Sequence, residues 1–133
     1  MSGVIIIRAL LAANTALTSV VPASKIMAGV IPINTVLPAI SISQISGVTR
    51  NTVSMNEAKV LATDRVQITV MAKDYASQKS ILDLVRAACP NTRGTVNGVA
   101  CDSIWSDTTG PDVFDDLAVI YFQSVDMMVR FIR

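Results

Sequence analysis

The side chains of this chain that could carry out chemistry are acids and bases, because the sequence contains no histidine. Histidine is the usual general base near neutral pH, the activating partner of nucleophilic serine and cysteine, and the commonest transition-metal ligand. The motifs G-x-x-x-x-G-K-[ST], G-x-G-x-x-G, G-x-S-x-G and S-x-x-K do not occur either. We therefore predict that the chain is not an enzyme and that it holds no metal ion and no cofactor.

Aspartates gather around one turn near the C-terminal end, and the sequence has no other acidic cluster. The members are Asp102, Asp107, Asp112, Asp115 and Asp116. The simplest interpretation is a solvated acidic turn. A second is a contact with a subunit or partner, in which the aspartates pair with basic residues such as Arg50, Lys59 or Arg65. A Ca²⁺ or Mg²⁺ site is a poor third, because the spacing departs from D-x-[DN]-x-[DN]-G and residues 110–111 are Gly-Pro.

The remaining polar residues indicate no dedicated site. The 11 basic residues form no run, and the formal net charge is +1, so we expect no specific nucleic-acid binding. Lys79 and Asp83 are expected to form a surface ion pair at i and i+4 of a helix. Cys89 and Cys101 are interpreted as small buried residues with free thiols. A disulfide between them is the alternative, although nothing in the sequence indicates an oxidising compartment.

The fold of the chain must position these residues. The part of the fold that the sequence predicts most clearly is a strand followed directly by a helix, between residues 65 and 90. The segment RVQITVMA (65–72) alternates between two faces, as a half-buried strand does. Asp74 stands at the N-cap position, where its carboxylate can accept from the amides of the first helical turn. Apolar residues then recur at helical spacing until Pro90, which cannot continue the helix.

Hydrophobic periodicity and turn residues divide the remaining sequence into further elements. The expected segments are a helix at 3–20 that ends at Pro22, an extended piece at 25–30, strands at 37–48 and from Val99, and a last strand at 114–131. The last strand carries apolar residues on both faces, so we expect both faces to be covered. The order predicts one two-layer α+β domain over residues 1–133, with two helices on one face of a mainly antiparallel sheet of four to five strands.

The composition indicates an assembled protein. Apolar residues make up 51% of the chain and charged residues 16%, against about 25% charged in an average soluble domain. No apolar stretch approaches the ~20 residues of a membrane-spanning helix. The start, MSGVIIIRALLAA, carries Arg8 within its apolar run and does not match a signal peptide. We therefore expect an intracellular subunit that buries much of its outer surface against other subunits.

The order of these pieces is similar to that in the tail-completion or tail-terminator proteins of long-tailed bacteriophages and gene transfer agents. The stretches that carry the resemblance are RALLAANTALTSVV, VIPINTVLPAISISQIS, RVQITVMAKDYASQKSILDLVRAAC and the two strands around the acidic turn. The resemblance implies a structural virion protein at the head–tail junction, assembled in the host cytoplasm and without a membrane. Members form a ring, typically of six subunits, which caps the head-proximal end of the tail tube and stops tube polymerisation. Implied partners are further copies of the chain, the tail-tube protein and a neck or head-completion protein, while DNA passes through the lumen.

A closed ring of identical subunits needs one patch of each subunit to fit a different patch on the next. Obligate contacts of this kind are large and apolar. We expect three such contacts: a polar arm or loop at 48–64, the outer face of the first helix, and the acidic turn. The candidate residues are Ile5, Ile6, Arg50, Met55, Lys59, Arg65, Asp107, Asp112, Asp115 and Asp116.

Other functions stay open from the sequence. One is a small-molecule-binding α+β regulatory module, which would need a convergent polar pocket. Another is a neck (head-completion) ring protein of similar shape. A third is an enzyme that uses the paired carboxylates of the acidic turn, which the missing acid–base and nucleophile motifs disfavour.

Overall fold

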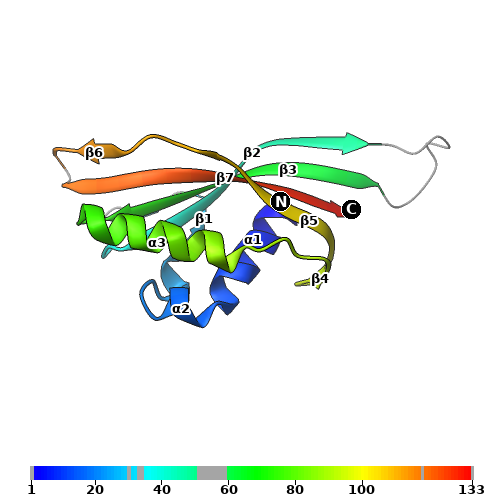
Figure 1. Ribbon diagram of the computed structural model, residues 1–133, viewed down its shortest axis with the longest axis horizontal. Coiled ribbons are helices and arrows are strands. Elements are labelled where there is room, and N and C mark those ends of the chain that lie inside the picture. The colour runs from blue at the N-terminus through cyan, green and yellow to red at the C-terminus, as the bar shows by residue number, and fades with distance from the viewer. Residues whose placement is uncertain (1, 30, 33–34, 51–59, 118, 133) are drawn as a thin grey trace.

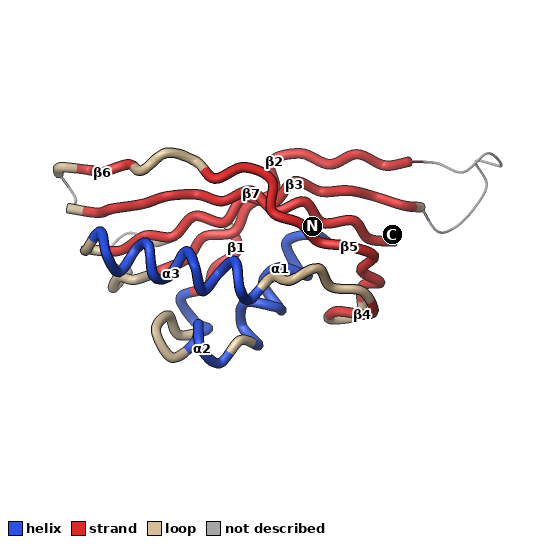
Figure 2. Tube along the Cα trace, viewed as in Figure 1, coloured by secondary structure: helices blue, strands red, loops and turns tan. Residues whose placement is uncertain are grey.

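The computed structural model describes residues 2–29, 31–32, 35–50, 60–117 and 119–132 (Figure 1, Figure 2). The helical elements are α1 (Ser2–Ala13), α2 (Thr15–Thr18), the 3₁₀ turn η1 (Ala23–Lys25) and α3 (Tyr75–Ala88). The strands are β1 (Ile26–Ala28), β2 (Ala39–Arg50), β3 (Leu61–Ala72), β4 (Gly94–Val96), β5 (Val99–Thr109), β6 (Val113–Asp115) and β7 (Ile120–Ile132).

The strands of the described chain belong to one sheet, in the order β1-β2-β3-β7-β5-β4, and β6 pairs with β7. Strand β1 runs parallel to β2, and the other pairings are antiparallel. The helices lie against one face of the sheet (Figure 1). The opposite face, which we call the open face, carries no helix from the described residues (Figure 2). The predicted α+β class with a mainly antiparallel sheet is therefore confirmed.

The predicted numbers of strands and helices are too low, since the described chain has seven strands and three α-helices. The unexpected strands β4 and β6 span three residues each, too few for an alternating pattern. The predicted helix at 3–20 is divided at Asn14, which has an extended backbone (φ −82°, ψ 113°). Its side-chain oxygen accepts a hydrogen bond from Leu17 N at 2.9 Å, so Asn14 is the N-cap of α2.

The predicted alternation at 65–72 is confirmed, because every second side chain of β3 is buried on the helix side of the sheet. Strand β7 alternates in the same way from Gln123 to Phe131, with partly exposed residues on the open face. The expectation that both faces of the last strand are covered is therefore wrong within the described chain. Strand β5 does not alternate simply, because its register shifts between Cys101 and Ser103. Cys101 is consequently buried, whereas Trp105, which simple alternation from Cys101 would place on the same face, is 39% exposed.

Helix α3 begins after Asp74 and ends before Pro90, as predicted. Asp74 has the expected extended backbone, but its carboxylate caps no amide of the helix and instead accepts a hydrogen bond from Ser77 Oγ at 3.4 Å. One stripe of the helix packs on β3 and β7. The buried members of that stripe are Gln78, Ile81, Leu82, Val85 and Ala88.

Helix α1 is attached to the sheet through Asp64, which is buried on the helix side of β3. Gly3 N donates a hydrogen bond to Asp64 Oδ2 at 3.2 Å. The first turn of α1 has no acidic residue of its own, so Asp64 supplies the negative group that helix N-termini favour. A Cβ atom on Gly3 would lie 2.8 Å from Asp64 Oδ2, and one on Gly47 would lie 2.7 Å from Asp64 Oδ1. Both positions therefore require glycine, because the backbone there lies too close to the Asp64 carboxylate to leave room for a side chain.

Candidate functional site

The structure divides four aspartates of the predicted acidic cluster into three parts, the first of which lies on the open face. The fifth, Asp102, lies apart from them, at the register shift of β5. Arg65 Nη2 is 2.6 Å from Asp107 Oδ2, and Arg65 Nη1 is 2.9 Å from Asp126 Oδ2. The hydrogen bond from Arg65 holds the pKa of Asp107 below its usual range. Arg65 and Asp107 were both predicted as contacts with a partner, but they contact each other within this chain.

The rest of the open face beside this ion pair is polar and aromatic. Thr69 Oγ1 and Ser124 Oγ are 2.9 Å apart, which links β3 to β7. The guanidinium carbon of Arg130 lies 5.6 Å from the centroid of the Trp105 ring. Sequence reasoning missed Arg130 and Trp105, because a shift in strand register brings them to the same face.

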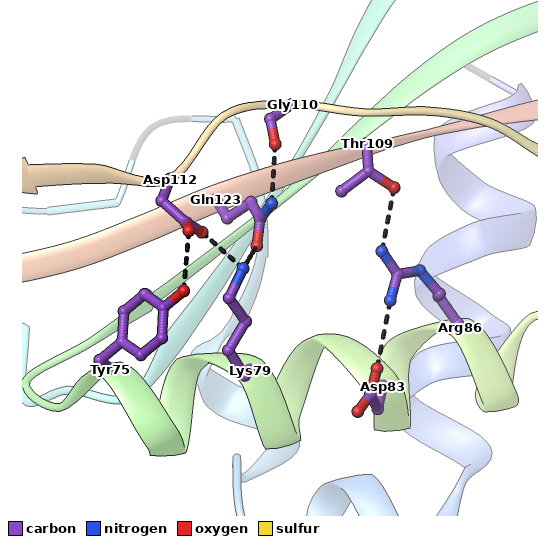
Figure 3. A network of polar contacts seen from close by, with 8 residues as sticks. All are labelled: Tyr75, Lys79, Asp83, Arg86, Thr109, Gly110, Asp112 and Gln123. Carbon is purple, nitrogen blue, oxygen red and sulfur yellow. Dashed lines mark hydrogen bonds and ion pairs between the residues drawn. The ribbon is translucent and has the colours of Figure 1, made fainter.

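The second part is a polar network that fastens the β5–β6 connection to α3 (Figure 3). Asp112 accepts hydrogen bonds from Tyr75 Oη at 2.9 Å and from Lys79 Nζ at 2.5 Å. Lys79 Nζ also donates to Gln123 Oε1 at 2.7 Å, and Gln123 Nε2 donates to Gly110 O at 2.7 Å. About two turns further along α3, Arg86 contacts Thr109 and Asp83 (Figure 3). The predicted Lys79–Asp83 pair is therefore wrong: Lys79 pairs with Asp112, and Asp83 pairs with Arg86.

We expect a Lys79→Met variant to raise the pKa of Asp112 towards the ordinary aspartate value. Hydrogen bonds from Lys79 and then Tyr75 lower the pKa of Asp112 in the native chain. A carboxyl whose pKa is lower when folded stabilises the fold above its unfolded pKa of about 4, and this contribution is lost as the pH falls through the folded pKa. An NMR pH titration of the Asp112 carboxyl carbon measures the shift.

Arg86→Met is the matched control for this titration. Arg86 lies on the same helix but contacts Asp83 and Thr109 instead of Asp112. The control should leave the pKa of Asp112 unchanged. An unchanged pKa of Asp112 in Lys79→Met as well would contradict the role given to Lys79.

The third part of the acidic cluster is the turn between β6 and β7, which holds Asp115 and Asp116. Asp115 Oδ1 accepts a hydrogen bond from Leu117 N at 3.0 Å, and Asp115 O accepts one from Val119 N at 2.8 Å. Leu117 is 98% exposed and Val119 57% exposed. The sequence pattern predicts that both residues belong to one continuous strand at 114–131. In the structure they instead project from the turn between β6 and β7.

The other predicted contact residues fall in three places. Ile5 on α1 is partly exposed and lines a shallow hollow with Arg8, Ala9 and Asn97. Ile6 is fully buried in the core of its own chain, so its prediction as an outer contact is wrong. Met55 and Lys59 lie outside the described residues.

The hairpin of β2 and β3 runs into the predicted arm at 48–64, and Arg50 is exposed at the end of β2. Ile45 and Val48 of β2 are 52% and 57% exposed. Val48 is the first residue of the predicted arm, whereas sequence reasoning missed Ile45. The β2–β3 register shifts between Gln44 and Ser46, so Ile45 is the bulged residue that breaks the alternation.

The cysteines are free and buried. Burial raises the pKa of the Cys89 thiol to about 12, and burial also raises the pKa of Cys101. A thiol with a raised pKa is a poor nucleophile and a poor metal ligand near neutral pH. No group of three or more acidic, histidine or cysteine side chains among the described residues could hold a metal ion. Within the same residues, no helix is long and apolar enough to cross a membrane.

Comparison with protein families finds a match to the family described as Tail completion protein gp17, over residues 6–119. The chain belongs to this family. As a tail completion protein it has a structural role in the phage tail and is a component of the virion. The family resemblance stated from the sequence is therefore confirmed. The members of this family are structural components of virions, which is consistent with the prediction that the chain is not an enzyme.

Among solved structures, the tail completion protein is similar in fold to a chain of the structure described as "Virion of native gene transfer agent (GTA) particle". The TM-score is 0.71 at 12% sequence identity, over 99% of this chain and 97% of that chain. The search of curated proteins found no match. The likeness in fold therefore spans the whole length of both chains.

Proposed function

We propose that this tail completion protein forms a closed ring, of six copies, on the head-proximal end of the phage tail tube. The ring stops tube polymerisation and joins the tail to the neck or head connector. The observation that carries the proposal is the family match over residues 6–119. The full-length fold similarity to a chain from a gene transfer agent virion supports it.

The arrangement of exposed surfaces is also suited to a ring. Strand β6 lies at one end of the sheet, and the last residues of β2 with the first residues of β3 lie at the other end (Figure 1). Two different exposed patches on one subunit permit a heterologous contact, which closes into a ring when the rotation between neighbours allows it. In this proposal residues 1–133 act as one unit, and the hairpin that leads into residues 48–64 is its projecting arm.

The proposed partners are other copies of the chain, the tail-tube protein and a neck or head-completion protein. Assembly takes place in the host cytoplasm, and the finished ring lies at the head–tail junction. DNA passes through the lumen without sequence-specific contacts, which agrees with a net charge of +1 and scattered basic residues.

Deleting the gene from a phage that carries it tests the proposal. We expect electron micrographs to show tails of uncontrolled length without attached heads, because nothing stops the tube or links it to the neck. A plasmid copy of the gene should restore tails of uniform length. Native mass spectrometry should find a particle of six times the 14.2 kDa chain. Tails of normal length attached to heads in the deletion strain would overturn the proposal.

A further inference from the structure

The β6–β7 end of the molecule carries an exposed apolar surface, which we call the tip patch. It consists of Val113, Phe114, Leu117 and Val119, with exposed fractions of 39%, 44%, 98% and 57%. Single exposed apolar residues are common on soluble proteins, whereas several large ones within one short strand and the turn that follows it are typical of an interaction site. The tip patch is therefore a candidate for contact with another protein.

The tip patch is held in a defined shape. Leu117 N and Val119 N both donate to Asp115, which fixes the turn. Val119 has a positive φ of 55°, a conformation that β-branched residues rarely adopt and that is found at functional positions. The ring of Phe114 lies 4.5 Å from that of Tyr121, centroid to centroid. Such a surface loses little conformational entropy when a partner binds.

The tip patch is acidic at its rim. Between Gly110 and Val119 the sequence has three aspartates and no basic residue. The charge of Asp112 is matched by Lys79, whereas Asp116 is exposed beside the apolar side chains. A partner for this surface should therefore combine apolar side chains with a basic residue.

The opposite end of the same sheet has that combination. The hairpin surface, which we define as Ile45, Val48 and Arg50, has two exposed apolar residues and one exposed base. The segment from Ser43 to Arg50 contains no acidic residue. Strand β1 pairs only with residues Ile40 to Ile42, so the rest of the outer edge of β2 has no neighbouring strand among the described residues. Such an edge, when it also carries apolar side chains, readily associates with another chain.

We propose that the tip patch of one copy docks on the hairpin surface of the next copy, with Asp116 facing Arg50. The inference rests on the proposed ring and names its subunit contact. The two surfaces differ and lie at opposite ends of the molecule (Figure 1), so each copy offers one of each to its neighbours. This is the heterologous geometry that a closed ring requires.

A charge exchange between the two surfaces tests this contact. We expect Asp116→Arg and Arg50→Asp each to raise the dissociation constant of the ring about tenfold or more, because each places like charges across the contact. Combining the two substitutions should restore assembly, since the charges are then exchanged. Leu117→Ser should weaken assembly by a similar factor through loss of the most exposed apolar residue. Analytical ultracentrifugation over a concentration series measures the constants, with circular dichroism to confirm folding.

Asp83→Arg is the matched control, because Asp83 is an exposed acid on α3 outside both surfaces. It should leave the ring unchanged. An unchanged dissociation constant of the ring in both Asp116→Arg and Leu117→Ser would overturn this contact. It would not contradict the proposal that the chain forms a ring. Variants that keep the ring but lose binding to the tail-tube protein would also overturn it, since the tip patch would then face another partner. A parent chain that forms no ring would overturn both proposals.

Discussion

An Ile68→Ala variant is expected to lose about 2–5 kcal/mol of unfolding free energy, because it deletes buried methyl groups from the middle of the sheet. Ile68 pairs with Ile42 of β2 and Val125 of β7, and all three side chains are fully buried. The surrounding strands are long and continuous, so the cavity has little room to collapse. Urea unfolding monitored by circular dichroism measures the loss, at one low protein concentration because assembly would add to the apparent stability.

Thr69→Ala is the control for this variant. Thr69 is the next residue along β3 and lies on the open face, where its hydroxyl is hydrogen-bonded to that of Ser124 at 2.9 Å. Its loss should cost about 0.5–1.5 kcal/mol, the usual net value of one such bond. Equal losses for the two variants would contradict a core that lies on one side of the sheet.

The two faces of β3 could be predicted from the sequence because burial under the helices imposes a period of two, and residues 65–72 have that period. The start and end of α3 could be predicted because Asp74 and Pro90 are residue types that favour helix ends, although the carboxylate of Asp74 caps no amide. The break at Asn14 was missed. Asparagine in a helical pattern is ordinary, and only the bond from Leu17 N shows that it caps a new helix.

The bulges of β2 and β5 could not be predicted, because a bulge is a property of two paired strands rather than of either sequence. They move Ile45 and Trp105 away from the faces that simple alternation gives them. The burial of Ile6 was missed because α1 contacts strands β1, β2, β3 and β7 and also α3, so an outward-facing side cannot be inferred from one helix alone.

The acidic cluster could be recognised from the sequence, but its division could not. Asp107 and Asp112 are neutralised by Arg65 and Lys79, which come from elements distant in the sequence. Asp116 is exposed beside the tip patch. Tertiary pairing therefore decides which aspartates of the cluster are matched by a base of the same chain, and this could not be predicted from their spacing in the sequence.

A Gly47→Ala variant is expected to destabilise the fold by about 1–3 kcal/mol, as overpacking usually does. The added Cβ would lie 2.7 Å from Asp64 Oδ1 and 3.0 Å from Gln44 Nε2. Glycine-to-alanine changes otherwise stabilise a protein by about 0.4–1 kcal/mol through the unfolded chain. A loss of stability would therefore have the opposite sign to the ordinary effect, and thermal or urea unfolding would measure it directly.

Gly110→Ala provides the comparison, because its Cβ would meet Ser124 O at 3.4 Å, close to ordinary contact. It should change stability by about 0.5 kcal/mol or less, as an unstrained surface substitution does. If Gly47→Ala is as well tolerated as Gly110→Ala, the close packing of Asp64 against the hairpin is not maintained in solution.

Asp64→Ala separates the clash from other effects of Gly47→Ala. Alone, it should cost about 1–3 kcal/mol, because it leaves the buried amide of Gly3 without its acceptor. In the double variant the carboxylate that the new methyl group would meet is gone, so the two costs should not add. A favourable coupling of about 0.5–3 kcal/mol is expected for residues in direct contact. Additive costs would mean that Gly47 acts independently of Asp64, whereas coupling would establish that one carboxylate joins the start of α1 to the base of the hairpin.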